Sequence, residues 1–500
     1  MNRRTFLRST LASAAALSLR PGIINSAFAA QLASPTVLKI VRRTIDVNGK
    51  AASVFGIQQS DGTPGIRLRS GDAFNVVLRN ESSEPTIVHW HGLDVPQEAD
   101  GHPRLAIGHG HEYVYDFEVT NRAGTYWYHP HPHMRTGAQV YQGLAGLLVV
   151  QDPEEERLGL PSGDAEHLCV IQDRRFDARN QLVFHGAGMM EMMNGFLGDR
   201  ILVNGIPQPT VDVDSGWHRI RLLNGSNARI YKLAWSRDVP MTMIGGDGGL
   251  LEQPLRRTVV TLAPAQRADI LVDLSHLPAG TDVHLESLAY PEADAGIVGM
   301  MGMMGGRAGA PNGAPLRIMT LRTRARRGRA FQMPGRLSAF DAKWTAAPAG
   351  PARIVPLTFM RMQWLLGGRT FEMAGVAPEE TVAAGSTGVW EFRNQANPMG
   401  MQAAHPIHVH GPQFRVLSRT GGAPNALREG IVDAGWQDTV LVLPGETVRV
   451  RVVNTDNGST NVWSGAPYRV LAVDGFDLTG PTELRDVKVA LSACGLCVLA

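Results

Sequence analysis

Hydrophobic and polar residues alternate with a period of two along much of the chain. The pattern is clearest in two segments, Phe74–Leu78 and Val448–Val452. Such alternation turns one face of an extended strand towards a core and the other towards solvent. Stretches with the period of a helix are nearly absent, and Gly (55) and Pro (31) are abundant, as in short strands joined by turns. The sequence therefore predicts an all-β protein.

One unit recurs along the chain: a turn led by Gly, an alternating strand and then Asn. It occurs at Gly71–Asn80, Gly216–Asn224, Gly385–Asn394 and Gly445–Asn454. The first three copies are spaced as the openings of three successive β-sandwich domains would be. A chain of 500 residues is also too long for one hydrophobic core. We therefore expect three domains.

Changes in composition divide the chain further. We expect a signal peptide (1–29), three sandwich domains (36–153, 165–290 and 351–453), a Met/Gly/Pro/Arg-rich linker (291–350) and an atypical tail (454–500). The linker has no buried-face pattern, which predicts loop or disorder. Within it, Arg322–Arg329 is expected to be a solvated basic segment.

The N-terminus has the pattern of an export signal. Twin arginines in Asn2–Leu7 precede the apolar Leu11–Leu19 and a small-residue site at Ala27–Ala29. This predicts passage through the twin-arginine translocation machinery to the periplasm or beyond; a disordered basic N-terminus is the alternative. The apolar stretch is too short to span a bilayer. Since nothing after residue 30 has a transmembrane pattern, we expect no stable membrane insertion.

Charge and cysteine content narrow the classes of function. A net charge of +2 gives no reason to expect nucleic acid as a partner. The three cysteines are too few for a disulfide framework. Cys169 lies in an apolar run and is expected in a buried strand. Cys494 and Cys497 form a Cys-x-x-Cys pair that suits redox chemistry or metal binding, although an incidental tail is the favoured interpretation.

Seven of the sixteen histidines fall in three short clusters. They are His89-Trp90-His91, His129-Pro130-His131 and His405-Pro406-Ile407-His408-Val409-His410. Alternating histidines on an extended strand or tight loop aim two imidazoles into one cavity. Neutral imidazole is a ligand for copper, zinc, iron and nickel. Because three clusters are hard to explain as core histidines, they predict a metal site.

These motifs resemble those of the multicopper oxidases, most closely the bacterial laccase-like and cuprous oxidases with three cupredoxin domains. The resemblance rests on His89–Leu93, on Trp127–His131 followed by Gly143–Gly146, and on His405–Gly411. It covers about residues 36–450. It implies three consecutive cupredoxin-like Greek-key sandwiches with bound copper (Cu).

The resemblance also implies a role for each histidine. A trinuclear copper cluster would lie between the first and third domains, and a type 1 copper would accept electrons from the substrate. The implied ligands are His89 and His408 (type 2), His91, His129, His131 and His410 (type 3) and His405 (type 1). Asp100 stands where the family places an acid that delivers protons to oxygen; an ordinary turn aspartate is the alternative. Asp438 looks like a partner of the type 1 histidine.

The chain departs from the family pattern after the third cluster. The family's fourth motif, His-Cys-His-x-x-x-His, is missing, since all sixteen histidines lie at or before His410. The type 1 Cys, its second His and two type 3 ligands are therefore missing. The tail Pro467–Leu491 resembles the middle-domain segment Pro240–Leu262. This favours a rearranged or truncated C-terminus, natural or from a sequence error; a divergent but functional ending is the alternative.

Two methionine-rich segments allow two interpretations. Thioether sulfur suits Cu(I), but methionine also fills irregular apolar gaps. For 300–304, which has no core pattern, copper is favoured; for 189–193 both interpretations stay open.

Three functions follow. The first is an exported enzyme that oxidises phenolic or aromatic substrates, or Cu(I), and reduces O₂ to water. The second is a copper-binding but catalytically impaired protein. The third is a non-enzymatic exported scaffold, as in relatives that have lost their copper ligands, and the intact clusters disfavour it. A two-domain nitrite reductase is a further alternative, against which three domain openings and the missing type 1 Cys argue. Without that Cys, we expect little or no oxidase turnover.

Overall fold

The computed structural model describes eleven stretches of the chain. They are residues 35–184, 195–295, 309–340, 351–360, 363–369, 381–382, 386–396, 400, 402–453, 487–488 and 491–493. The expected signal peptide, both methionine-rich segments, Cys494 and Cys497 lie outside these residues. Within them, no helix has the length and apolar character needed to cross a membrane.

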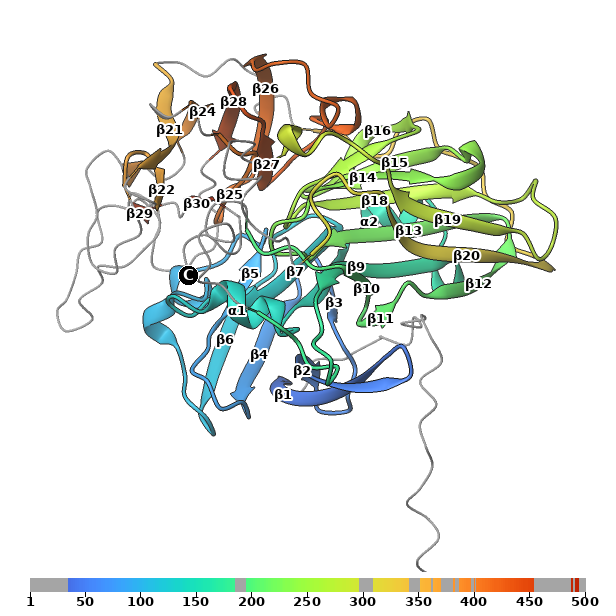
Figure 1. The fold of residues 1–500 in the computed structure, drawn as a ribbon, viewed down its shortest axis with the longest axis horizontal. Coiled ribbons are helices and arrows are strands. Elements are labelled where there is room, and N and C mark those ends of the chain that lie inside the picture. Colours follow the sequence, from blue (N-terminus) through green and yellow to red (C-terminus); the bar gives the residue numbers. More distant parts are fainter. Residues whose placement is uncertain are drawn as a thin grey trace, which may run out of the picture.

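Two sheets make the first domain, which is blue to teal in Figure 1. One has the strand order β2-β1-β4-β6: β1 (Thr36–Val47), β2 (Lys50–Gln59), β4 (Ala73–Asn80) and β6 (Glu112–Glu118). The other has the order β3-β8-β7-β5: β3 (Ile66–Arg69), β5 (Val88–His91), β7 (Gly124–Pro130) and β8 (Gly146–Gln151). Their inward faces bury a core that includes Phe74, Trp90 and Tyr115. This core fixes the strands that carry the first two histidine clusters.

The second domain, green to yellow in Figure 1, also has two sheets. The larger, ordered β11-β10-β9-β13-β18-β15-β16, contains β9 (Glu166–Arg174), β10 (Arg200–Val203), β11 (Ile206–Pro207), β13 (Trp217–Asn224), β15 (Met241–Gly246), β16 (Gly249–Arg257) and β18 (Arg267–Asp273). The smaller, ordered β12-β20-β19-β14-β17, contains β12 (Thr210–Ser215), β14 (Tyr231–Trp235), β17 (Val260–Leu262), β19 (Asp282–Ser287) and β20 (Leu316–Arg327).

The third domain is orange to red in Figure 1. Its sheet β22-β21-β24-β28-β26 contains β21 (Arg353–Met360), β22 (Gln363–Leu366), β24 (Thr387–Asn394), β26 (Phe414–Gly421) and β28 (Glu446–Val453). The sheet β27-β25-β30 contains β25 (His405–Val409), β27 (Thr439–Val442) and β30 (Leu491–Ala493), and β23 (Thr381–Val382) pairs with β29 (Val487–Lys488). The described pieces of the tail thus pair with this domain, with Ser492 opposite His408.

Helices in the described residues are short and lie between strands. They are α1 (Thr136–Tyr141), α2 (Pro153–Arg157) and the 3₁₀ turns η1 (Gln97–Ala99), η2 (Pro103–Leu105), η3 (Gly163–Ala165), η4 (Ser236–Asp238), η5 (Glu292–Asp294) and η9 (Arg428–Gly430). The predicted all-β class is therefore confirmed.

The expected linker 291–350 differs from the structure. Leu316–Arg327 forms β20, which pairs with β12 and β19 inside the second domain. Its first half buries Ile318 and Leu321 in the domain core, whereas Arg324–Arg327 is exposed. The basic residues that we assigned to a solvated linker therefore begin on a strand. Arginines on the outward face obscured the apolar alternation of the inward one.

The recurring turn–strand–Asn unit forms one strand in each domain (β4, β13 and β24) and ends in the same way each time. Its asparagine is buried, and the side-chain amide donates to backbone carbonyls. The bonds run from Asn80 to Glu84 (2.8 Å) and Ile107 (2.9 Å), from Asn224 to Arg229 (2.8 Å) and Leu262 (2.8 Å), and from Asn394 to Ala403 (2.6 Å) and Leu443 (3.0 Å). Each asparagine thus ties the end of its strand to neighbouring backbone segments, where it adds a second donor to carbonyls such as those of Glu84, Ile107 and Leu443.

The variant Asn80→Ala should lower the free energy of unfolding by about 3 kcal/mol. It removes one donor from the carbonyls of Glu84 and Ile107 and leaves the buried Ser82 N–H without its acceptor, Asn80 Oδ1 (2.9 Å), and such an unsatisfied group costs about 1–3 kcal/mol. Urea unfolding followed by tryptophan fluorescence measures the loss. Asn75→Ala is the control, because Asn75 is half-buried on the other face of β4; it should cost less than about 1 kcal/mol. Equal losses would contradict the assigned role.

Candidate metal centre

Six of the seven clustered histidines meet between the first and third domains. His89 and His91 lie on β5, and His129 lies on β7 directly opposite His89 in an antiparallel pair. His408 lies on β25, and His410 directly follows that strand. Alternation along each strand turns these side chains to the same side. The sequence clusters therefore combine into one centre.

Three pairs of imidazoles are relevant to metal binding, and the rings of His91 and His408 and of His89 and His410 also stack, with centroids 3.5 and 3.8 Å apart. His89 Nε2 lies 3.4 Å from His408 Nε2, and His91 Nδ1 lies 3.4 Å from His129 Nε2. The rings of His131 and His410 are 5.3 Å apart, centroid to centroid, and nearly perpendicular. Two of the pairs join a histidine of the first domain to one of the third.

In the two pairs with a nitrogen–nitrogen distance of 3.4 Å, the ring nitrogens on the far side face oxygen atoms. His89 Nδ1 donates to the Asp100 carbonyl (2.9 Å), His408 Nδ1 to the Asp438 carbonyl (2.8 Å) and His129 Nδ1 to the Pro130 carbonyl (3.0 Å). His91 Nε2 donates to Asp438 Oδ1 (3.1 Å). Because these oxygens only accept, the far nitrogens carry the protons.

The inner nitrogens of the two 3.4 Å pairs therefore face each other with lone pairs. Two lone pairs at this distance repel unless a cation lies between them. Neutral imidazoles arranged in this way fit a metal ion, and nitrogen ligands of this kind suit copper. The oxygen partners behind the rings are those that orient metal-binding histidines in proteins.

The electrostatics keep these rings neutral. Burial is the main cause that lowers the pKa of His89, His91, His129 and His408, and neighbouring imidazoles lower the values further. A metal ion therefore does not have to displace protons from these nitrogens at neutral pH.

Asp100 connects two of the histidines to the surface. Its Oδ2 accepts from His410 Nδ1 (3.0 Å), and its Oδ1 lies 3.0 Å from His89 Nδ1. The side chain is 26% exposed, so it lies between the buried rings and solvent. Burial alone would raise its pKa, but His410 and His89 hold the pKa well below the usual value. The next residue, Gly101, has φ +78°, and a Cβ there would lie 2.3 Å from the Val88 carbonyl.

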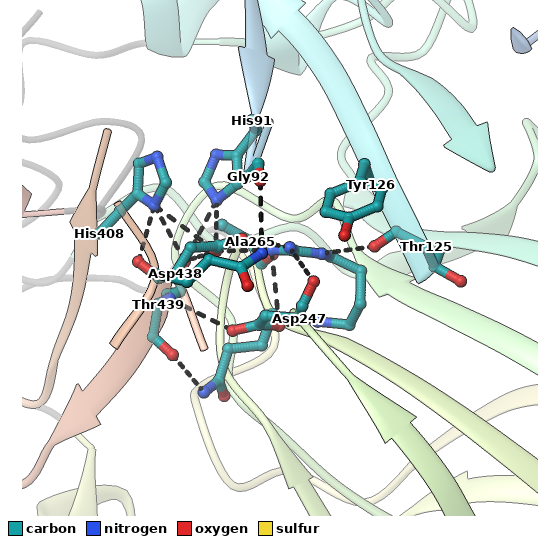
Figure 2. A network of polar contacts seen from close by, with 12 residues as sticks. His91, Gly92, Thr125, Tyr126, Asp247, Ala265, His408, Asp438 and Thr439 are labelled. Carbon is teal, nitrogen blue, oxygen red and sulfur yellow. Dashed lines mark hydrogen bonds and ion pairs between the residues drawn. The ribbon is translucent and has the colours of Figure 1, made fainter. Parts of the chain in front are cut away.

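Asp438 lies elsewhere than expected. We expected it beside His405, but its carboxylate bonds His91 and its carbonyl bonds His408, both in the six-histidine centre (Figure 2). The reason is the start of β27, which pairs with β25 so that Thr439 lies opposite His408. The carboxylate then points into the domain junction. Its pKa is well below normal: burial raises it, but Arg267 and His91 more than offset that effect.

His405 lies apart from the six. It is buried, its ring contacts Trp364 edge-on at 4.4 Å, and its Nε2 has no hydrogen-bond partner among the described residues. Burial lowers its pKa to about 4. An unpaired nitrogen is compatible with a ligand, but none of the His, Cys, Asp and Glu groupings found in the described residues includes it.

Two charged residues of the second domain lie at the six-histidine centre but were not predicted from the sequence. Arg267 and Asp247 are fully buried at the junction, where Arg267 pairs with Asp438 (Figure 2 labels Asp247 and Asp438). The available signal was Arg267 at the head of the strand-like segment Ala268–Val272, in which only Asp269 is not apolar, because such a charge is buried only when it is paired.

Known proteins share this architecture. Sequence models of the multicopper oxidase family match residues 39–155 and 348–463. The multicopper oxidase mco of Staphylococcus epidermidis is 28% identical over 396 residues, covering 79% of this chain and 77% of the relative. Cell division protein FtsP of Sodalis glossinidius is 30% identical over 409 residues, with coverage of 79% and 77%. The crystal structure of a McoA multicopper oxidase variant from Aquifex aeolicus has a TM-score of 0.71, 34% identity and coverage of 85% and 90%.

His405→Leu should make the metal-free chain less sensitive to acid. The folded pKa of His405 is about 4 and the ordinary value is 6.5. Between these two pH values the unfolded chain binds a proton at His405 that the folded chain does not bind. The free energy of unfolding of wild type therefore decreases as the pH falls below 6.5, and His405 does not affect it above pH 6.5. Urea unfolding at pH 7.5 and at pH 4.5 measures the loss of unfolding free energy on acidification. This loss should be about 2–3 kcal/mol smaller in His405→Leu than in wild type. The exposed His111→Leu is the control; equal slopes in all three proteins would refute the assignment.

Proposed function

The chain belongs to the multicopper oxidase family, and from this premise we propose that it is an exported copper protein whose six-histidine centre serves the reduction of O₂. In this proposal His89 and His408 hold a type 2 copper, and His91, His129, His131 and His410 hold the type 3 pair. The reductant is a phenolic or aromatic molecule, or Cu(I). Oxidation of such a reductant coupled to reduction of O₂ to water is the reaction that this centre fits best.

One observation carries the proposal: the lone pairs of two inner imidazole pairs face each other at 3.4 Å, while their outer nitrogens are committed to oxygen acceptors. A core histidine would use one nitrogen as a donor and the other as an acceptor. Here the inner nitrogens are left for a cation. Copper is the cofactor of this family, and imidazole is among its preferred ligands.

The chain's own groups perform separate tasks in this proposal. Bound copper supplies the one-electron steps that reduce O₂. The imidazoles hold it between two domains, and Asp438 and the carbonyls behind the rings fix their orientation. Asp100 is partly exposed and contacts His410 and His89, which makes its carboxylate the candidate to pass protons from solvent.

The proposed type 1 site, which would accept electrons from the reductant, is less complete than the six-histidine centre. His405 is the candidate type 1 ligand, and the described residues around it include no cysteine that could complete a blue-copper site. Cys169, the one described cysteine, is buried in the second domain. We therefore propose that the chain binds copper but turns over slowly.

Similarity to FtsP favours a second candidate, a role in cell division without oxidase chemistry. The six converging histidines argue against loss of the metal. Absence of copper from the purified chain would favour this second function.

The copper content of the purified chain, reloaded with Cu²⁺ and freed of excess ion, tests the proposal. We expect up to about three tightly bound ions, one for each histidine pair. His408→Ala should reduce the content because it opens the pair with His89. His284→Ala, which changes a histidine of the second domain, should not. Equal copper in wild type and His408→Ala would reject the centre.

Oxygen consumption by the same samples tests the second half of the proposal. With a phenolic reductant or Cu(I), we expect little turnover and no intense blue absorption. Rapid turnover and a blue band would each require a copper–thiolate bond. Sustained oxygen uptake with a blue band would mean that a cysteine completes the type 1 site.

Export is proposed from Arg3 and Arg4 in the N-terminal signal pattern. Cell fractionation should find wild type in the periplasm and the variant Arg3→Lys/Arg4→Lys in the cytoplasm. Arg8→Lys is the control, and an unchanged distribution in both variants would reject this route.

A further inference from the structure

The second domain supplies none of the six histidines, yet one of its side chains reaches the centre. Arg267 opens β18, and its side chain is 0% exposed. It forms a two-pronged ion pair with Asp438 of the third domain: Nη1 donates to Oδ1 at 2.8 Å, and Nη2 pairs with Oδ2. Such planar pairing fixes both partners more firmly than a single contact.

The remaining donors of Arg267 are also committed. Nε donates to the Thr125 carbonyl of the first domain (3.0 Å). Nη1 and Nη2 donate to the carbonyls of Ala265 and Asp247 in its own domain, each at 2.9 Å. All five N–H groups of the guanidinium therefore have acceptors, drawn from all three domains. The orientation of the side chain is fully determined.

This ion pair acts on the metal centre through Asp438. The oxygen that accepts from Arg267 Nη1, Oδ1, also accepts from His91 Nε2 at 3.1 Å. The Thr439 hydroxyl donates to this oxygen (2.9 Å) and lies 3.2 Å from His91 Nε2, which it can only accept from. With Nε2 protonated, His91 presents the lone pair of Nδ1 towards His129.

Gly92 shows how closely the first domain fits this pair. A Cβ at Gly92 would lie 2.3 Å from Asp438 Oδ2 and 2.8 Å from Arg267 Nη2, and its φ is +88°. The backbone that follows His91 thus lies directly against the ion pair (Figure 2). Glycine is required here both for the close approach and for the backbone conformation.

We propose that Arg267 is a positioning residue: it fixes the Asp438 carboxylate, which holds His91 in the tautomer that binds metal through Nδ1. The second domain thereby controls a centre to which it gives no ligand. The inference rests on the proposed function, because it concerns the same histidines. It goes further in assigning a task to the second domain and to Arg267.

Arg267→Met and the milder Arg267→Lys test the assignment. Methionine keeps most of the length of the side chain but removes its charge. Lysine keeps the charge but cannot form the two parallel contacts with the Asp438 carboxylate. Copper affinity, measured by titrating the metal-free full chain with Cu²⁺ against a chromophoric chelator, should fall by about 10–100-fold in Arg267→Met and by less in Arg267→Lys. The electron paramagnetic resonance spectrum of bound Cu(II) should also change.

Arg221→Met is the matched control. Arg221 is also 0% exposed, pairs with Glu166 and Glu155, and donates to Thr125 Oγ1 (3.0 Å), but it has no contact with Asp438. Its loss should lower the melting temperature and leave copper affinity within about twofold of wild type. If Arg267→Met and Arg221→Met have the same copper affinity, Arg267 is merely structural.

A double-mutant cycle without copper separates this inference from the proposed function. Arg267→Lys and His91→Ala should give non-additive shifts in melting temperature, since both act on Asp438. Arg221→Met and His91→Ala should be additive. Additivity in the first cycle overturns the inference even if wild type binds copper, whereas coupling in a chain that binds no copper overturns only the proposed function. If Arg267→Met does not fold, Arg267→Lys alone decides the affinity comparison.

Discussion

Opposed imidazole lone pairs are the constraint on which the rest of the centre depends. Two pairs of nitrogens from different strands face each other at 3.4 Å. They stay there because carbonyl and carboxylate oxygens hold the outer nitrogens as donors, and because burial favours neutral rings. Such an arrangement stores repulsion that a bound cation relieves. Pairing of β5 with β7 creates one of these contacts inside the first domain, and the approach of the third domain to the first creates the other.

The buried charged residues at the domain junction hold the groups around this centre in one geometry. Burying Arg267, Asp438 and Asp247 is costly, and an ion pair repays that cost only when every donor and acceptor is used. Arg267 meets this condition with acceptors from three domains. Burial, opposed by Arg267 and reinforced by the nearby Asp438, raises the pKa of Asp247 to about 7. A network of this kind adds little to stability, but it specifies one geometry.

The sequence predicted the all-β class, one strand of each domain (β4, β13 and β24, although none of them opens its domain) and a metal site formed by the histidine clusters. These features depend on local alternation and on residue types with few structural alternatives. It failed where the deciding contact joins distant segments. Asp438 was placed with His405, because nothing local shows that β27 aims it at His91. Arg267 went unnoticed for the same reason: its partner lies 171 residues away. The strand β20 was assigned to a linker because its outward face carries arginines.

Anomalous diffraction from crystals of the copper-loaded chain, recorded on both sides of the copper absorption edge, tests the central claim most directly. The account predicts peaks between His89 Nε2 and His408 Nε2, between His91 Nδ1 and His129 Nε2, and beside the His131–His410 pair. It also predicts that Asp438 still bonds His91 Nε2 when copper is present. Fully occupied copper found only elsewhere in the chain, or His91 binding copper through Nε2, would contradict it.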